Sequence, residues 1–146
     1  MKVLKTPDQT IPGINTVQYS AADAIGTSSS FPVPDQGIIE SVAVTDLADQ
    51  SGAFDILLFD TDITSGTNNA AFDMADADAA NFIGSIAIVA GDYQTLNDNA
   101  VGTQRNIGMA YQCRGGTMYY QCVARGTPTY AAAGDLVFSL TISHGR

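Results

Sequence analysis

The sequence predicts an all-β protein, a jelly-roll-like β-sandwich with one short helix around residues 69–82. Short runs rich in β-branched and aromatic residues recur along the chain, separated by Gly, Pro and Asn turns, as in sandwiches and jelly rolls. Several of these runs alternate apolar and polar residues, which is typical of half-buried strands. Because 45% of the 146 residues are apolar, the chain can bury a core. We expect one sandwich domain over residues 14–146, preceded by an N-terminal arm over residues 1–13.

The predicted arm differs from the rest of the chain in composition. Its two prolines disfavour regular structure, and Lys2 and Lys5 stand apart from the acidic body that follows. Residues 26–37 form the next irregular stretch. They contain three serines and two prolines, which exclude a regular helix and favour a loop.

Three strands are predicted in the middle of the chain. Residues 38–45 alternate, and their apolar face consists of Ile38, Val42 and Val44. Residues 54–59 are apolar on both faces apart from Asp55, so they predict a central strand. Residues 85–89 follow Gly84 and end before a Gly-Asp turn.

Residues 69–82 supply the predicted helix. Its apolar residues recur at helical spacing, and they are Phe72, Ala75, Ala79 and Phe82. Three aspartates between them are expected to face outward or to cap the helix. They are Asp73, Asp76 and Asp78.

The C-terminal half predicts a β-hairpin and a last strand. Two alternating runs flank Gly115-Gly116, and paired glycines favour a two-residue turn because both can take positive φ. This turn pairs the apolar residues on one face: Cys113 with Met118, Tyr111 with Tyr120, Met109 with Cys122, and Ile107 with Ala124. The last strand, residues 136–142, alternates strictly, with Leu136, Phe138, Leu140 and Ile142 on one face.

The predicted hairpin also decides the state of the two cysteines. Cys113 and Cys122 lie four positions apart along it, about 13 Å at strand rise. The Cα atoms of a disulfide lie within about 7 Å of each other. We therefore expect two free thiols in the core.

The charge distribution excludes several classes of partner. The net charge is −9, and between Thr6 and Gln104 there are fourteen Asp or Glu residues and no Lys or Arg. Nucleic-acid binding needs a basic stripe, which is absent, and an anionic membrane would repel the chain. No run approaches the roughly 20 apolar residues of a membrane span. The N-terminus lacks the apolar core of a signal peptide, so we expect synthesis in a cytoplasm with reduced thiols.

No constellation of residues predicts catalysis, a cofactor or a metal. Five aspartates could supply oxygen ligands to calcium, but they lack the spacing of an EF-hand loop, and turn-forming or capping roles are favoured. They are Asp60, Asp62, Asp73, Asp76 and Asp78. His144 is the only histidine and lies near the C-terminus, outside any triad pattern. Glu40 is the only Glu and Trp is absent, which weakens a glycosidase or lectin interpretation.

Tyrosines and arginines in the C-terminal half suggest two further surfaces. Four tyrosines can form a ligand patch or, as the hairpin register favours, pack in a core or interface; they are Tyr111, Tyr119, Tyr120 and Tyr130. Four arginines in the last 42 residues predict either a basic end that meets the acidic face of a neighbouring subunit or a chance grouping. They are Arg105, Arg114, Arg125 and Arg146.

Four parts of the chain carry a family resemblance. The first is Tyr19-Ser-Ala-Ala-Asp-Ala-Ile-Gly26. The second combines Leu57-Leu-Phe-Asp60, Asn69-Ala-Ala-Phe-Asp73, Ala75-Asp-Ala-Asp78 and Ile83-Gly84. The third and fourth are Thr103-Gln-Arg-Asn-Ile-Gly108 and Arg125-Gly-Thr-Pro-Thr-Tyr130. In this order, over roughly residues 16–142, they resemble a family of small tailed-bacteriophage virion structural proteins. The Ser-rich stretch with Pro32 and Pro34 departs from the family pattern.

The resemblance implies a capsid decoration (cement) protein, which is not an enzyme and has no catalytic residues or cofactor. Such proteins have a jelly-roll-like sandwich, lie on the outside of the head shell, often form homotrimers, and clamp neighbouring major capsid proteins. The chain would be made in the host cytoplasm and located on the capsid surface of the virion, without nucleic-acid or membrane partners. In the arm, Lys2, Lys5 and Pro7 are candidate capsid contacts. The alternatives are a tail or head-fibre component that binds a host glycan through exposed Tyr and Asp, and a small hydrolase.

Overall fold

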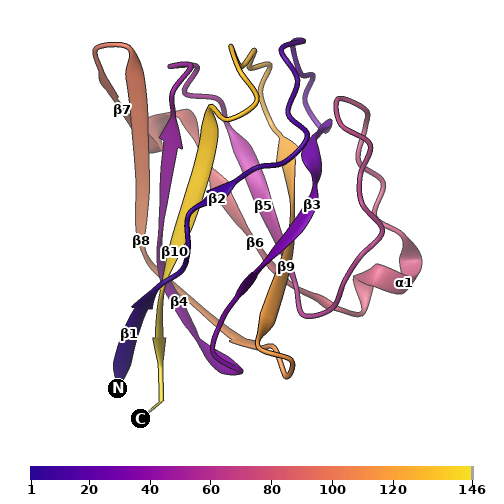
Figure 1. The fold of residues 1–146 in the computed structure, drawn as a ribbon, viewed down its shortest axis with the longest axis vertical. Helices are drawn as coiled ribbons and strands as arrows, with labels where there is room; N and C mark the ends of the chain where they lie inside the picture. Colours follow the sequence, from indigo (N-terminus) through magenta and orange to yellow (C-terminus); the bar gives the residue numbers. More distant parts are fainter. Residues whose placement is uncertain (146) are drawn as a thin grey trace.

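Two antiparallel sheets face each other across a hydrophobic core in the computed structural model, which describes residues 1–145 (Figure 1). The predicted all-β sandwich with one short helix is confirmed. The six-stranded sheet has the order β1-β10-β4-β8-β7, and β2 also pairs with β10. Its strands are β1 (Lys2–Lys5), β2 (Gln9–Thr10), β4 (Gln36–Asp46), β7 (Tyr93–Leu96), β8 (Asn99–Gln112) and β10 (Leu136–His144).

The four-stranded sheet has the order β3-β9-β5-β6. Its strands are β3 (Ala24–Pro32), β5 (Phe54–Phe59), β6 (Phe82–Ile88) and β9 (Thr117–Ala124). Two short helical turns complete the described elements, α1 (Asp76–Ala79) and the 3-10 turn η1 (Ala90–Asp92). No helix among residues 1–145 has both the length and the apolar character needed to cross a membrane.

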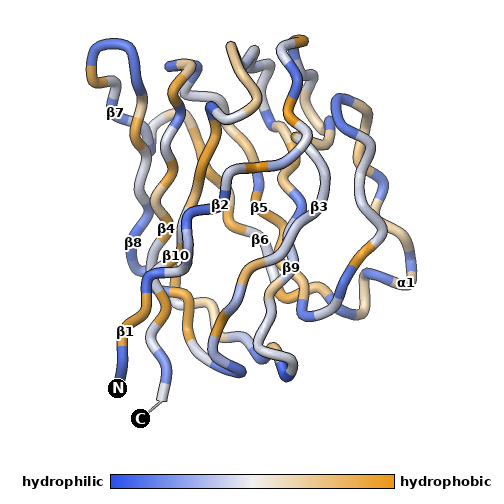
Figure 2. Tube along the Cα trace, viewed as in Figure 1, coloured by the Kyte–Doolittle hydropathy of each residue, from blue (hydrophilic) through white to orange (hydrophobic). Residues whose placement is uncertain are grey.

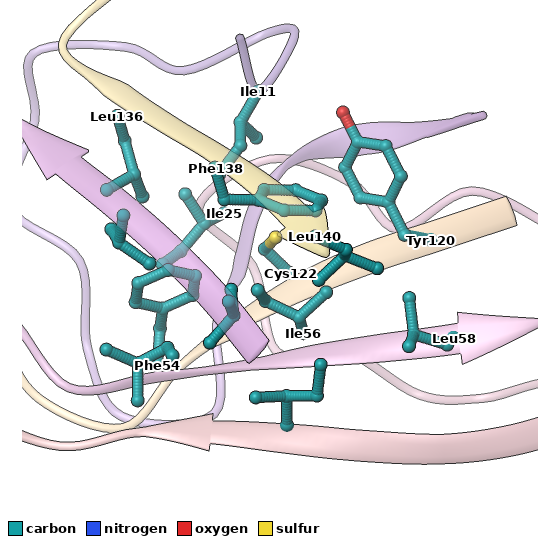
Figure 3. Close-up of a cluster of buried hydrophobic side chains, with 14 of the residues drawn as sticks. Ile11, Ile25, Phe54, Ile56, Leu58, Tyr120, Cys122, Leu136, Phe138 and Leu140 are labelled. Carbon is teal, nitrogen blue, oxygen red and sulfur yellow. The ribbon is translucent and has the colours of Figure 1, made fainter. Parts of the chain in front are cut away.

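Aromatic side chains from both sheets meet in the main core (Figure 3). The ring of Phe138 from β10 lies edge-on to that of Tyr120 from β9, with centroids 4.9 Å apart. Phe138 also contacts Phe31 of β3 edge-on at 6.1 Å. The strict alternation predicted for the last strand is confirmed, because Leu136, Phe138, Leu140 and Ile142 are all buried in this core.

The central position predicted for residues 54–59 is also confirmed. β5 pairs with β9 on one side and with β6 on the other. Its Ile56 and Leu58 enter the main core, whereas Leu57 and Phe59 enter a second cluster on the outer face of the sheet. The segment after β5 covers that face, with Ile63, Phe72 and Met74 in the second cluster. The strand is apolar on both sides because both of its faces are covered.

The predicted β-hairpin around Gly115-Gly116 is wrong. β8 pairs with β4 and β7, whereas β9 pairs with β3 and β5 in the other sheet. The turn between β8 and β9 therefore crosses from one sheet to the other and lies beside the equivalent turn between β3 and β4. The Val33 N–H donates to the Gly116 carbonyl at 3.0 Å, and the Cys113 N–H donates to the Asp35 carbonyl at 2.7 Å.

Three local expectations are also corrected. The stretch 26–37 is mostly strand, because Gly26 to Pro32 belong to β3 and pair irregularly with β9. In β4 the pairing shifts around Glu40, so Ile39 is buried and Ile38 is 42% exposed. A bulge of this kind reverses the facing of the residues before it. The helix is a single turn, Asp76–Ala79, and the rest of 69–82 is loop and the start of β6.

The N-terminal segment, for which the sequence predicts an arm, pairs with β10 of its own chain. Lys2 to Lys5 lie antiparallel to Thr141–His144, and Thr10 lies opposite Val137. Between these strands the Thr6 N–H donates to the Leu140 carbonyl, and its hydroxyl accepts from the Leu140 N–H, both at 2.9 Å. Ile11 is buried in the main core. Residues 2–11 thus form one edge of the six-stranded sheet.

Candidate functional site

The end of the sandwich where the N-terminus and His144 lie has a concave surface beside an edge strand. We call it the terminal end; the turns between β3 and β4 and between β8 and β9 also lie there (Figure 1). A hollow of about 520 Å³ runs between β1 and the β3–β4 turn. A second hollow, of about 450 Å³, is lined by Met1, by residues of β4, β8 and β10, and by Gly145. His144 lines both hollows.

The N-terminal edge surface, as we name it, consists of β1 and the apolar residues around these two hollows. The 520 Å³ hollow is lined by Leu4, Lys5, Pro7, Pro32, Val33, Pro34 and His144. The second hollow includes Met1, Ile38 and Tyr111. Met1 is 90% exposed and Val3 is 66% exposed. Figure 2 shows β1 as an apolar centre between two hydrophilic ends.

β1 forms the outer edge of the six-stranded sheet. It pairs with β10 on one side, and no other described strand pairs with it. Its four residues are all exposed. An edge strand of this kind presents backbone N–H and C=O groups that a second chain can pair with.

The predicted contact residues lie on this surface. Lys5 and Pro7 line the 520 Å³ hollow, and Lys2 lies opposite His144 in the strand register. Lys5 forms an exposed ion pair with Asp8 at 3.3 Å. Leu4 lines the same hollow as Lys5 and Pro7, but the sequence does not indicate it as a contact residue, because the strand pairing that places it there is not visible in the sequence.

The two ends of the sandwich differ in charge. At the terminal end the basic residues Lys2, Lys5 and Arg114 lie among four exposed aspartates, which are Asp8, Asp35, Asp60 and Asp62. The loops at the opposite end carry Asp23, Asp49, Asp92, Asp98 and Asp135. The Arg125 guanidinium is there too, but it forms an ion pair with Asp55 at 2.6 Å. The terminal end is therefore the end where positive and negative charges are most nearly balanced.

The arginines predicted to form a basic end are not gathered in one place. Arg114 precedes β9 and Arg125 follows it, so they lie at opposite ends of that strand. Arg105 lies within β8. Arg146 lies outside the described residues.

The acidic segment 60–78 supports the loop that covers the four-stranded sheet. Asp78, expected to face outward or to cap the helix, is buried, and its Oδ2 accepts the Thr64 N–H at 2.9 Å. The Asp60 carboxylate accepts from the Thr61 hydroxyl at 3.0 Å. Among residues 1–145, no three His, Cys, Asp or Glu side chains are grouped closely enough to hold a metal ion.

The buried cysteines and tyrosines contribute to the core. Cys113 and Cys122 are buried and free, as predicted, although the hairpin on which that prediction rested does not form. Tyr120 and Tyr130 are fully buried, so the four tyrosines form no surface patch. Burial raises the pKa of Tyr111 to about 12. Its hydroxyl has no hydrogen-bond partner among the described residues.

Comparisons of the chain with protein-family models, with curated proteins and with solved structures gave no match.

Proposed function

We propose that the chain is a capsid decoration (cement) protein, a virion component that binds the outside of a phage head shell. The proposal combines the family resemblance with one structural observation. An exposed edge strand lies beside an apolar hollow, at the end of the sandwich where charges are most nearly balanced. In this proposal the partner is the major capsid protein, the location is the capsid surface, and no step is catalysed.

The N-terminal edge surface would supply the contact with the shell. Leu4 and the three prolines around the hollow offer apolar area, and the free side of β1 offers backbone groups. Lys2 and Lys5 offer positive charge to carboxylates of the shell protein. Each contact of this size is weak, so a homotrimer would gain affinity because its three copies bind together.

Binding to isolated head shells tests the proposal. Val3→Glu places a carboxylate on β1. Val17→Glu is the matched control because it is similarly exposed, 61% against 66%, on a loop that is hydrogen-bonded to residues 127–128 at the opposite end. A carboxylate buried without a partner should weaken binding by about tenfold or more. We expect Val3→Glu to lose co-sedimentation with heads and Val17→Glu to retain it. Equal retention by both variants would refute this surface as the contact.

The second candidate function is a tail or head-fibre component that binds a host glycan. One observation favours it, a polar hollow of about 650 Å³ lined by the segment after β5, by residues of β6 and β8 and by the turn after β8. Binding of this kind requires no contact through β1.

A further inference from the structure

The polar hollow lies between the segment after β5 and the last residues of β8. Asp60 and Thr61 come from the segment after β5, and Ile83 comes from β6. Gln112, Arg114 and Gly115 line the other wall. Its volume of about 650 Å³ falls within the range of small-molecule sites in proteins.

Backbone groups are also available at this wall. β7 pairs only with residues 99–102 of β8. Beyond Gly102, β8 pairs with β4 on one side, and no described strand pairs with it on the other. The N–H and C=O groups on that free side can bind a ligand, because they have no partner in the sheet.

The two charged side chains of the hollow differ in what they already bind. The Asp60 carboxylate accepts a hydrogen bond from the Thr61 hydroxyl at 3.0 Å. Arg114 is exposed, and among the described residues no carboxylate lies within ion-pair distance of it. Its guanidinium has five N–H donors in a planar fork that matches a carboxylate. A ligand that pairs with Arg114 must therefore carry an anionic group.

The remaining lining fits a hydroxylated molecule. Asp60 and Gln112 provide acceptors for hydroxyl groups. Ile83 and Ala110 provide apolar surface against which the C–H face of a sugar ring can pack. The combination of an unpaired guanidinium, amide and carboxylate acceptors and an apolar wall is that of a site for a charged sugar.

We propose that this hollow binds a saccharide that carries a carboxylate, with Arg114 pairing to the carboxylate and Asp60 and Gln112 accepting from sugar hydroxyls. The proposal gives a site to the second candidate function. The site uses no residue of β1, so a substitution on β1 separates it from the proposed shell contact.

An NMR titration of the ¹⁵N-labelled full chain tests the proposal, with 3′-sialyllactose and lactose as matched probes. They differ by one carboxylated sugar. We expect shift changes centred on Asp60, Thr61 and residues 110–115. The dissociation constant for sialyllactose should be at least about tenfold lower than that for lactose, because sialyllactose gains one charge-assisted hydrogen-bonded pair with Arg114.

Four variants test the site. Arg114→Ala should abolish the preference for sialyllactose, whereas Arg105→Ala, an exposed arginine elsewhere on β8, should keep it. Gly115→Phe should block both sugars; a Cβ on Gly115 meets nothing within 4 Å, so the fold should tolerate it. Val3→Glu should bind sialyllactose as the wild type does, which separates this site from shell binding. Absence of localised shifts, or an Arg114→Ala variant that keeps the preference, would overturn the proposal.

Discussion

Replacing Gly26 with alanine should strongly destabilise the protein, because the N-terminal segment packs directly against this glycine. Gly26 has a φ of +68°, and a Cβ there would lie 2.0 Å from the Pro12 carbonyl oxygen and 2.9 Å from Cγ2 of Ile11. Neither the backbone oxygen nor the buried isoleucine can move without disturbing the sheet edge. The alanine therefore forces residues 11–12 away from β3.

The magnitude follows from three contributions. A non-glycine residue at this φ costs about 1 kcal/mol. Displacing Pro12 breaks the hydrogen bond from the Thr27 N–H to the Pro12 carbonyl, 2.9 Å long, which is worth about 1 kcal/mol. Partial exposure of Ile11, which is 1% exposed, costs about 1–2 kcal/mol. We expect the free energy of unfolding to fall by about 3–4 kcal/mol, a large part of the ~5–15 kcal/mol typical of a domain.

Urea denaturation followed by circular dichroism measures the effect, with two glycine controls. Gly108 also has a positive φ, +66°, but a Cβ there meets nothing within 4 Å. Gly108→Ala should therefore cost only about 1 kcal/mol. Gly91 has neither feature, so Gly91→Ala should be close to neutral. If Gly26→Ala destabilises no more than Gly108→Ala, residues 11–12 do not pack as described.

Three further predictions concern the core. Phe138→Ala should lower the free energy of unfolding by about 3–5 kcal/mol in the same assay, because its ring contacts Tyr120 and Phe31. Val137→Ala, on the half-buried opposite face of the strand, should lower it clearly less. Equal losses would contradict the facing of β10. Both thiols should resist Ellman's reagent at pH 8 in the native protein and react in urea. Burial raises the pKa of Cys113 to about 11 and raises the pKa of Cys122 further. A thiol that reacts fast in the native protein would contradict the burial of both cysteines. The free energy of unfolding should fall as pH rises from about 9 towards 11, because the unfolded chain releases thiol protons that the folded chain retains. The fall should reach up to ~1.4 kcal/mol per pH unit for one thiol. A flat profile between pH 9 and 11 would argue against buried thiols.

Side-chain facing could be predicted well where strands are regular. β10 alternates without interruption, and β5 is apolar on both faces because one segment of the chain covers its outer side. The predicted facing is wrong at the start of β4. Because the pairing is irregular around Glu40, Ile39 is buried and Ile38 is exposed. A bulge depends on how the strand pairs with its neighbours. The local periodicity of the sequence carries no information about that pairing.

Strand connectivity was less predictable, and the candidate site depends on it. The apolar residues of β8 and β9 face the same core whether the turn at Gly115-Gly116 forms a hairpin or crosses between sheets. Alternation therefore cannot distinguish the two arrangements. The N-terminal edge surface joins Leu4, Pro32–Pro34 and His144, which are far apart in the sequence. Pairing of β1 with β10 brings Leu4 close to His144, and the turn between β3 and β4 adds Pro32–Pro34. Lys2, Lys5 and Pro7 could be chosen from composition alone, but the hollow beside them could not.

Cryo-EM of particles that carry this protein bears most directly on the proposed function. Sandwich-shaped density should lie on the outside of the head, with β1 and the 520 Å³ hollow against the major capsid protein and the aspartate-rich loops pointing to solvent. Density on the tail would contradict a decoration role, and density on the head with the aspartate-rich loops against the shell would contradict the proposed contact surface.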